Sequence, residues 1–209
     1  MTACSLLSLV VAMPELIVPL FIFAFTGSIT PGPNTIMLTA SGAAFGLQRT
    51  VPHIAGITLG FPVMIIAVGL GLGEVFTRFP ALHVALKYIG AAYLLYLAWR
   101  IANAGSANGR EAGGRPLTFL EAAGFQWVNP KAWMLALSSI PAFTTVGGNY
   151  YAELGLIALA FGVACVPACV VWCLFGVGIR QLISSPETAR VVNLTLAAAV
   201  ALSVVLLFM

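Results

Sequence analysis

Charged residues are scarce in this sequence. Its 209 residues include only 9 Lys and Arg and 6 Asp and Glu, so 7% are charged, whereas a soluble domain is about one quarter charged. Hydrophobic residues make up 61% of the chain, which leaves too few polar side chains to cover a soluble core. The composition excludes a soluble globular protein and predicts an integral membrane protein whose partner is the lipid bilayer.

Several kinds of functional site are also missing. The sequence contains no nucleophile–base pair, phosphate-binding loop or paired carboxylates in a plausible arrangement, so nothing favours an enzyme or a cofactor. His53 and His83 have no Asp, Glu or Cys at metal-ligand spacing, so we expect no metal site and place both at the membrane interface. The net charge of +3 is too small and too scattered for nucleic-acid binding.

The first long apolar stretch contains no cysteine. Cys165, Cys169 and Cys173 recur every four residues along a later stretch and therefore share one helix face. Such positions do not suit a disulfide, and we interpret the three as small residues that pack against a neighbouring helix. A soft-metal or redox site is the alternative.

Six apolar stretches are long enough to cross a bilayer, which takes about 20 residues. They are residues 14–46, 52–73, 80–102, 117–143, 151–179 and 189–208. The polar segment 103–116 is rich in Gly, Asn, Ser and Arg and predicts a flexible linker. We expect one all-α transmembrane domain over residues 1–209, with a first repeat at 14–102 and a second at 117–208. Because each repeat has three spans, the two repeats must be inverted relative to each other.

The leading span of each repeat is interrupted by proline. The first contains Thr30-Pro31-Gly32-Pro33-Asn34 and the second contains Asn129-Pro130-Lys131. Proline removes a backbone donor and clashes with the preceding turn, so we predict that the first helix breaks at Pro31 and Pro33 and the fourth at Pro130. Matching interruptions in corresponding spans point to the binding site of a transporter. A plain proline kink is the alternative.

The two interruptions predict a site for a zwitterion. Amides at Gly32 to Asn34 begin a half-helix and suit a carboxylate, whereas carbonyls at Ser28 to Thr30 end the previous half-helix and suit an ammonium. Lys131 lies midway along its apolar stretch, where a charge costs at least ~2.5 kcal/mol, so it needs an anion or a carbonyl cage unless it snorkels to the interface. The predicted substrate-binding residues are Thr30, Gly32, Pro33, Asn34, Asn129 and Lys131. Gly42 with Gly46, and Gly56 with Gly60, have the spacing of close helix packing.

Four sequence segments resemble the LysE/RhtB family of amino-acid exporters. They are Thr30 to Met37, Ala55-Gly56 with Gly60-Phe61, Gly90 to Leu94 with Leu97 to Trp99, and Asn129 to Trp133. The resemblance implies a six-helix, multi-pass exporter of the inner membrane that expels amino acids against inward proton movement. The pattern is closer to the branch that exports neutral amino acids, such as homoserine, threonine and cysteine, than to the branch for basic ones.

Two other functions and the oligomeric state stay open. A passive channel for small solutes would have the same composition. A membrane thiol–disulfide relay would resemble this chain in its two three-helix halves, but it carries a cysteine in the first span of each half, which is absent here. The sequence does not exclude a homo-oligomer.

Basic residues predict the orientation in the membrane, and a reporter fusion tests it. Arg49, Arg100, Arg110, Arg115, Arg180 and Arg190 follow spans one, three and five, whereas Arg78 and Lys87 lie on the opposite side. Since Lys and Arg accumulate in cytoplasmic loops, both termini should lie outside the cytoplasm. A reporter that is active only outside the cytoplasm should be active when it is fused after Met209. A reporter that is active only in the cytoplasm should be inactive there. Cytoplasmic activity there, with residues 103–116 accessible from outside, would contradict both the orientation and the number of spans.

Overall fold

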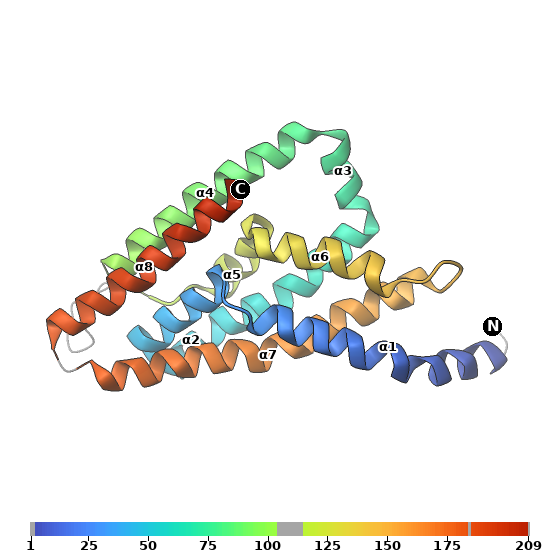
Figure 1. Cartoon of the computed structure of the whole chain (residues 1–209), viewed down its shortest axis with the longest axis horizontal. Helices are drawn as coiled ribbons and strands as arrows, with labels where there is room; N and C mark the ends of the chain where they lie inside the picture. Colours follow the sequence, from blue (N-terminus) through green and yellow to red (C-terminus); the bar gives the residue numbers. More distant parts are fainter. Residues whose placement is uncertain (1–2, 104–114, 184, 209) are drawn as a thin grey trace.

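A computed structural model describes residues 3–103, 115–183 and 185–208, and this part of the chain consists of helices and short connections, without a strand. Figure 1 shows long helices, some along the longest axis of the molecule and two, in green and red, oblique to it. Ten helical elements follow one another along the chain: α1 (Ala3–Ile29), α2 (Pro33–Ala67), η1 (Val68–Leu72), α3 (Gly73–Arg78), α4 (Pro80–Ala102), α5 (Phe119–Phe125), η2 (Gln126–Val128), α6 (Pro130–Phe143), α7 (Tyr150–Leu182) and α8 (Pro186–Phe208). The predicted linker lies mostly outside the described residues.

Helix α2 reverses its direction at Gly46. This glycine has a φ of 77°, in the left-handed region that favours glycine. Ser41 and Thr50 are nine residues apart, which is about 13 Å along a straight helix, yet their hydroxyls lie 2.9 Å apart. The segment before Gly46 therefore folds back on the segment after it. The predicted boundary near residues 46–52 is a tight turn within a continuous helical stretch.

The long helix α7 packs along both segments of α2. Before the turn, Thr39 donates a hydrogen bond to the carbonyl of Trp172 (3.3 Å). After the turn, Gly162 faces Thr58 and Pro62, and the Tyr150 hydroxyl donates to the Gly69 carbonyl (2.6 Å). The second segment of α2, with η1, therefore runs antiparallel to α7.

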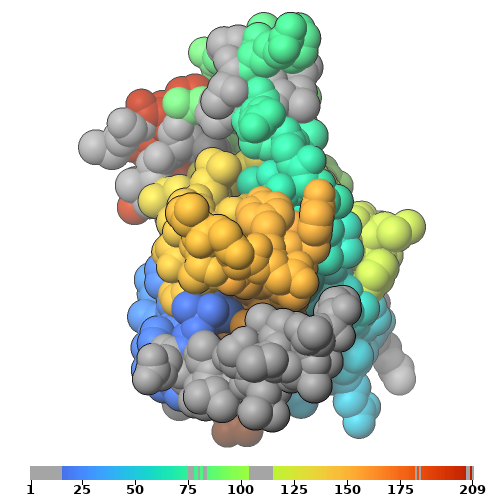
Figure 2. All heavy atoms as spheres, turned by 90° about the vertical axis from the view of Figure 1, so that its right-hand side faces the viewer, coloured from blue at the N-terminus to red at the C-terminus, as the bar shows by residue number. Residues whose placement is uncertain are grey.

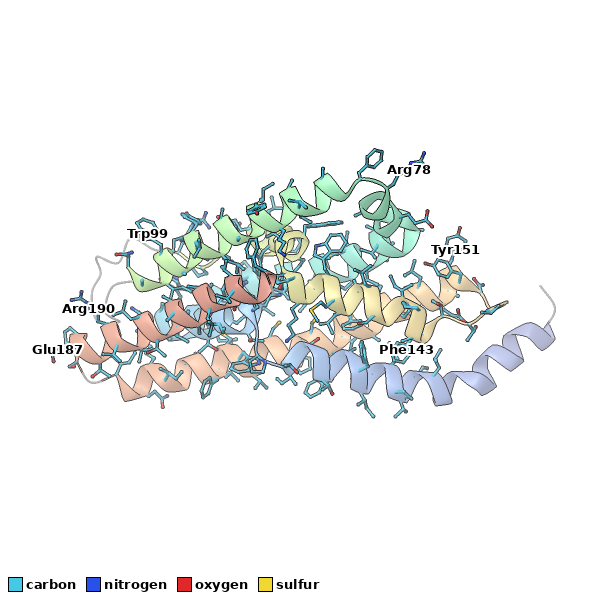
Figure 3. The ribbon with its side chains drawn as sticks, turned by 45° about the horizontal axis from the view of Figure 1, so that its top comes forward. Arg78, Trp99, Phe143, Tyr151, Glu187 and Arg190 are labelled. Carbon is cyan, nitrogen blue, oxygen red and sulfur yellow. The ribbon has the colours of Figure 1, made fainter. Side chains whose placement is uncertain are left out.

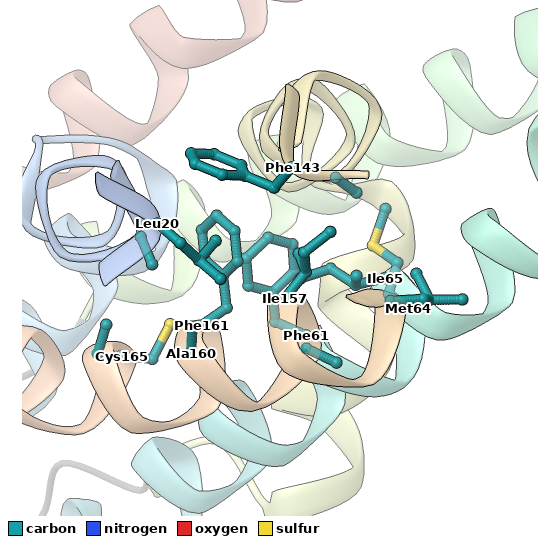
Figure 4. Close-up of a cluster of buried hydrophobic side chains, with 14 of the residues drawn as sticks. Leu20, Phe61, Met64, Ile65, Phe143, Ile157, Ala160, Phe161 and Cys165 are labelled. Carbon is teal, nitrogen blue, oxygen red and sulfur yellow. The ribbon is translucent and has the colours of Figure 1, made fainter. Parts of the chain in front are cut away.

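Two buried clusters fill the interior. The first joins α1, α2, α6 and α7 and includes Leu20, Met64, Ile65, Phe143, Ile157 and Phe161, as Figure 4 shows. The second joins α2, α4, α5, α7 and α8 and includes Leu38, Ile57, Leu94, Phe125 and Val200. In the view of Figure 2, the connection between α6 and α7, in orange, lies between α1 in blue and the teal segment around α3.

Helices α4 and α8 form a separate antiparallel pair. The ring of Phe208, at the end of α8, lies 5.5 Å from the ring of Tyr88, near the start of α4, and 4.6 Å from the ammonium of Lys87. Both helices expose large apolar side chains on their outer faces, such as Ile89 and Leu202. Lipid rather than water suits such surfaces.

The helices are long and apolar enough for a membrane protein. Four described helical stretches reach membrane-spanning length, namely Pro33–Leu72, Val84–Ala102, Tyr150–Gln181 and Pro186–Val205, and Leu16–Ile29 is a shorter apolar helix. These stretches bear out the predicted all-helical membrane class. The count of four treats the two segments of α2 on either side of Gly46 as one.

Glycines allow α2 to touch its neighbours through the backbone. A Cβ on Gly42 would overlap the carbonyl of Cys173, and one on Gly176 would overlap the carbonyl of Thr39. Gly56 and Gly60 face α5, where a Cβ on Gly60 would lie 2.7 Å from the Cα of Ala123. Three of the four glycines predicted to mediate packing do so, whereas Gly46 forms the turn instead.

Substitution of Gly176 by alanine should destabilise the protein by about 1–3 kcal/mol, because overpacking a close contact forces backbones apart. A Cβ on Gly178, two residues later in α7, would have nothing within 4 Å, so Gly178→Ala is a matched control that should be neutral or stabilising. Unfolding of both purified variants in mixed detergent micelles measures the difference. Equal stability of the two variants would show that the α2–α7 contact tolerates a side chain.

Candidate substrate site

The first helix break lies where the prolines predict it. Helix α1 ends at Ile29, residues 30–32 are not helical, and Pro33 is the first residue of α2. A first helical residue needs no amide hydrogen, so proline fits there. The carbonyl of Ile29 accepts a hydrogen bond from the indole of Trp172 (2.9 Å), and the carbonyl of Thr30 accepts one from the ammonium of Lys131.

The start of α2 keeps some of its amides available. Thr35 provides partners for both backbone groups of Gly32, since its hydroxyl accepts a hydrogen bond from the Gly32 amide (2.8 Å) and donates one to the Gly32 carbonyl (2.9 Å). The amides of Asn34 and Thr35 belong to the first turn of α2 and have no carbonyl one turn earlier in the same helix. They form the positive end of the helix dipole.

The second break is at Asn129, between η2 and α6. The Asn129 side chain accepts a hydrogen bond from the amide of Lys131 (3.2 Å) and caps α6, which begins at Pro130. The indole of Trp133 reaches back to the carbonyl of Trp127 (2.8 Å). An indole thus satisfies a freed carbonyl at each break, with Trp172 in the first and Trp133 in the second.

The two breaks face each other. Besides the bond from Lys131 to the Thr30 carbonyl, the side-chain amide of Asn34 donates to the Gln126 side chain (2.9 Å). A Cβ on Gly32 would lie 2.9 Å from Cδ of Lys131. The backbone of Gly32 is extended, with φ 179°, so glycine is needed here for the space it leaves to the lysine.

A small cavity lies between the breaks. Its volume is about 40 Å³, which is room for a few water molecules and too little for an amino acid. Residues of both breaks line it together with α7: Ser28, Gly32, Asn34, Gln126, Asn129, Lys131, Cys165 and Cys169. The structure therefore has a small cavity between the two breaks, beside which the Lys131 ammonium donates to the Thr30 carbonyl.

The structure brings most of the predicted site residues together. Gly32, Asn34, Asn129 and Lys131 line the cavity. Thr30 contributes its carbonyl, whereas its hydroxyl donates to the Thr26 carbonyl of its own helix (2.6 Å). Pro33 is buried and Pro31 exposed, and neither lines the cavity in this state. Lys131 donates to the Thr30 carbonyl, which is the kind of carbonyl partner that we predict for it.

Sequence reasoning missed Gln126. Its side chain is only 1% exposed; it accepts from Asn34 and donates to the Ala122 carbonyl (2.8 Å). The signal that could have found it was a glutamine inside an apolar stretch, three residues before Asn129, since polar residues within spans are costly and tend to be functional.

Two cysteines border the cavity without pairing. The Cys165 thiol lies 3.2 Å from the Ser28 hydroxyl of α1. Cys165, Cys169 and Cys173 are all free and buried. The nearest polar partner of Cys165 on α1 is thus a serine and not a second thiol, which disfavours the relay.

His53, which we place at the membrane interface from the sequence, is buried within the helix bundle. Its side chain is 1% exposed, and neither ring nitrogen has a hydrogen-bond partner among the described residues. Within the same described part, no group of three His, Cys, Asp or Glu residues could hold a metal ion. The side chain of His83 lies outside the described residues.

Comparison with known proteins decides the family. Residues 25–209 match the family described as LysE type translocator. This chain belongs to the LysE family. Its members are transporters and not enzymes, which agrees with the apolar helices and confirms the family suggested by the sequence segments.

Several relatives in the LysE family are about one third identical to this chain over the region that matches. A cysteine/O-acetylserine efflux protein of Salmonella choleraesuis is 31% identical over 131 residues, which is 62% of this chain and 66% of the relative. The protein of that name from Klebsiella pneumoniae is 33% identical over 133 residues, with the same coverage. The matched region thus spans just under two thirds of each relative. No solved structure matches this chain.

The bond between Asn34 and Gln126 should stabilise the closed site. Asn34→Ala should lower the free energy of unfolding by about 1–3 kcal/mol, because it leaves the buried Gln126 amide with an unpaired group. The double variant Asn34→Ala/Gln126→Ala should cost less than the sum of the two single changes. Unfolding in mixed micelles gives all three values, and Asn103→Ala, at an exposed helix end, is the control. Strict additivity would show that the two side chains do not interact.

Proposed function

We propose that this protein is a secondary transporter of the inner membrane that exports small neutral amino acids, such as cysteine or O-acetylserine, in exchange for protons. One observation carries the proposal: the two helix breaks face each other across a small cavity, and Lys131 of one break binds the Thr30 carbonyl of the other. The names of the efflux relatives in Salmonella and Klebsiella support this substrate class.

The chemistry of the breaks suits a zwitterion. The amides of Asn34 and Thr35 and the ammonium of Lys131 favour a carboxylate. The Thr30 carbonyl favours an ammonium, and in the closed state Lys131 occupies it. On binding, the amino group of the substrate takes the place of the lysine at Thr30, and the released lysine pairs with the substrate carboxylate. Lys131 thus acts as a tethered competitor that keeps the empty site closed.

A neutral side chain fits the rest of the cavity. The lining beyond the breaks is apolar or weakly polar, with Leu38, Phe61, Cys165 and Cys169. Among the described residues, the cavity lining contains no Asp or Glu to pair with a basic side chain. A cationic substrate would also meet the charge of Lys131, so the site favours neutral amino acids.

The packing supports six crossings in two inverted halves. The turn at Gly46 divides α2 into two crossings, so that α1 with the first segment of α2 corresponds to α5, η2 and α6. The second segment of α2 pairs with α7 and α4 pairs with α8, each antiparallel. Inverted halves place corresponding helices antiparallel in this way. The two broken helices are the third corresponding pair.

The ends of the molecule support the predicted orientation. Trp99, Glu187 and Arg190 lie at one end, and Arg78 and Tyr151 at the other (Figure 3). Arg190 belongs to the larger basic group, so its end should be cytoplasmic. The break cavity then lies between the two surfaces, as alternating access requires.

Transport by Lys131 variants tests the function. Purified protein in proteoliposomes should exchange labelled cysteine, O-acetylserine, homoserine or threonine but not lysine or arginine. Lys131→Ala should insert normally, since removal of a buried charge relieves an insertion cost of at least ~2.5 kcal/mol, yet lose most exchange. Lys131→Arg should be partly active, because a planar guanidinium is not equivalent to an ammonium.

Lys87→Ala is the matched control, because Lys87 lies at the start of α4 against Phe208, away from the cavity. It should transport like the natural protein. Full exchange by Lys131→Ala at normal abundance would refute the site. Uptake that persists unchanged when the proton gradient is collapsed, and shows no exchange of substrates, would identify a passive channel.

A further inference from the structure

His53 is a buried imidazole without a hydrogen-bond partner. It is 1% exposed, and both Nδ1 and Nε2 lack partners among the described residues. Leaving a buried polar group unsatisfied costs about 1–3 kcal/mol, and a methionine or leucine could fill the same volume without that cost. Ionisable residues inside membrane spans usually mark a functional path. Packing alone does not explain a histidine here.

The ring lies between the cavity and one end of the bundle. Ile57, one turn after His53, lines the cavity, and residues four apart share a helix face. Gly56, three residues after His53, packs against α5, where a Cβ would lie 2.6 Å from the Cβ of Ala122. The face of α2 that carries His53 therefore turns toward the start of α5.

Hydroxyl groups lie between this position and the turn at Gly46 along the chain. Thr50, one turn before His53, is fully buried. Its hydroxyl lies 2.9 Å from that of Ser41 and donates to the Gly46 carbonyl (2.8 Å). Arg49, next to Thr50, is exposed. Hydroxyl groups thus lie between the ring and the surface at the turn.

Few charged groups surround the ring. From α5, the carboxylate of Glu121 is within electrostatic reach of the ring, and Glu121 binds Arg115 of the preceding segment through two contacts of 2.6 and 2.7 Å. Tyr93 of α4 lies near the same carboxylate, and the Cys173 thiol of α7 bonds Thr50. Helix α8 carries its charges, Glu187 and Arg190, only at its start. Glu121 is therefore the carboxylate that acts on the ring.

We propose that His53 carries the proton that this transporter exchanges for its substrate. The neutral ring accepts one proton to become imidazolium when the protein is open to the outside, and releases that proton toward the Gly46 turn on the cytoplasmic side. The inference rests on the proposed export function and on its coupling to protons.

The position of Glu121 explains how the charge on His53 acts on the cavity. An imidazolium attracts the Glu121 carboxylate in competition with Arg115. Glu121 also holds the start of α5 through the amide of Thr118 (2.8 Å), and α5 leads directly into Gln126, which binds Asn34. A proton on His53 therefore pulls on the short helix that closes one side of the cavity.

Replacement of His53 by glutamine tests the inference in proteoliposomes. Exchange of labelled cysteine across the membrane, without a gradient, should continue. Uptake into vesicles with an acidic lumen should lose its stimulation by the pH gradient, because no group exchanges the proton. The chain contains only 2 histidines, so His83→Gln is the matched control. It should keep the full stimulation by the pH gradient. Gradient-driven uptake by His53→Gln at the natural level would overturn the inference.

The natural protein separates failure of this inference from failure of the function. If the natural protein exchanges no amino acid at all, the export function is wrong. If it exchanges amino acids but does not respond to the pH gradient, proton coupling and the role of His53 are wrong while export stands.

A second measurement covers a variant that fails to fold. The His83→Gln protein contains His53 as its single histidine, so its imidazole NMR signal reports on His53 alone. Added cysteine should shift the titration of that signal, because substrate and proton compete through α5. A titration that is the same with and without cysteine would show a packing role and overturn the inference.

Discussion

Freed backbone carbonyls at the two helix breaks need partners, and the rest of the site depends on how they find them. In a bilayer an unsatisfied carbonyl costs several kcal/mol. The indole of Trp172 satisfies Ile29, the indole of Trp133 satisfies Trp127, and the ammonium of Lys131 satisfies Thr30. Two of these bonds are made by the uncharged indoles of Trp172 and Trp133. The third is made by the charged ammonium of Lys131, and under the proposed function this is the contact that a substrate ammonium replaces.

The sequence predicts the breaks because they are local. Proline beside asparagine in an apolar stretch identifies both positions, and four of the six predicted binding residues line the cavity. Proline alone is a poor guide, however, since Pro52, Pro62, Pro141 and Pro167 lie inside helices without ending them. The two effective prolines, Pro33 and Pro130, are the first residues of new helices, where the missing amide hydrogen costs nothing.

Contacts between distant segments could not be predicted in the same way. Gln126 and Asn34 form a hydrogen bond although 92 residues separate them in the sequence. No local sequence pattern predicts such a contact. The sequence around His53 is typical of a membrane interface, because a proline precedes it and a polar turn lies nearby. Only the packing of α5 against Gly56 shows that its ring is buried. The same holds for Gly46, whose spacing suits helix packing but whose positive φ serves the turn.

Helix α7 has a consequence for the surrounding membrane. Its 33 residues extend about 50 Å at 1.5 Å per residue, whereas the hydrocarbon layer is about 30 Å thick. An upright, straight α7 would expose apolar side chains to water at both ends, and tilting, kinking or a local thickening of the bilayer relieves this mismatch. Since α2 packs along its length on both sides of the turn, a change in tilt carries both segments of α2 with it. Bilayer thickness, and hence lipid chain length, thereby acts as a mechanical load on the helices that enclose the cavity.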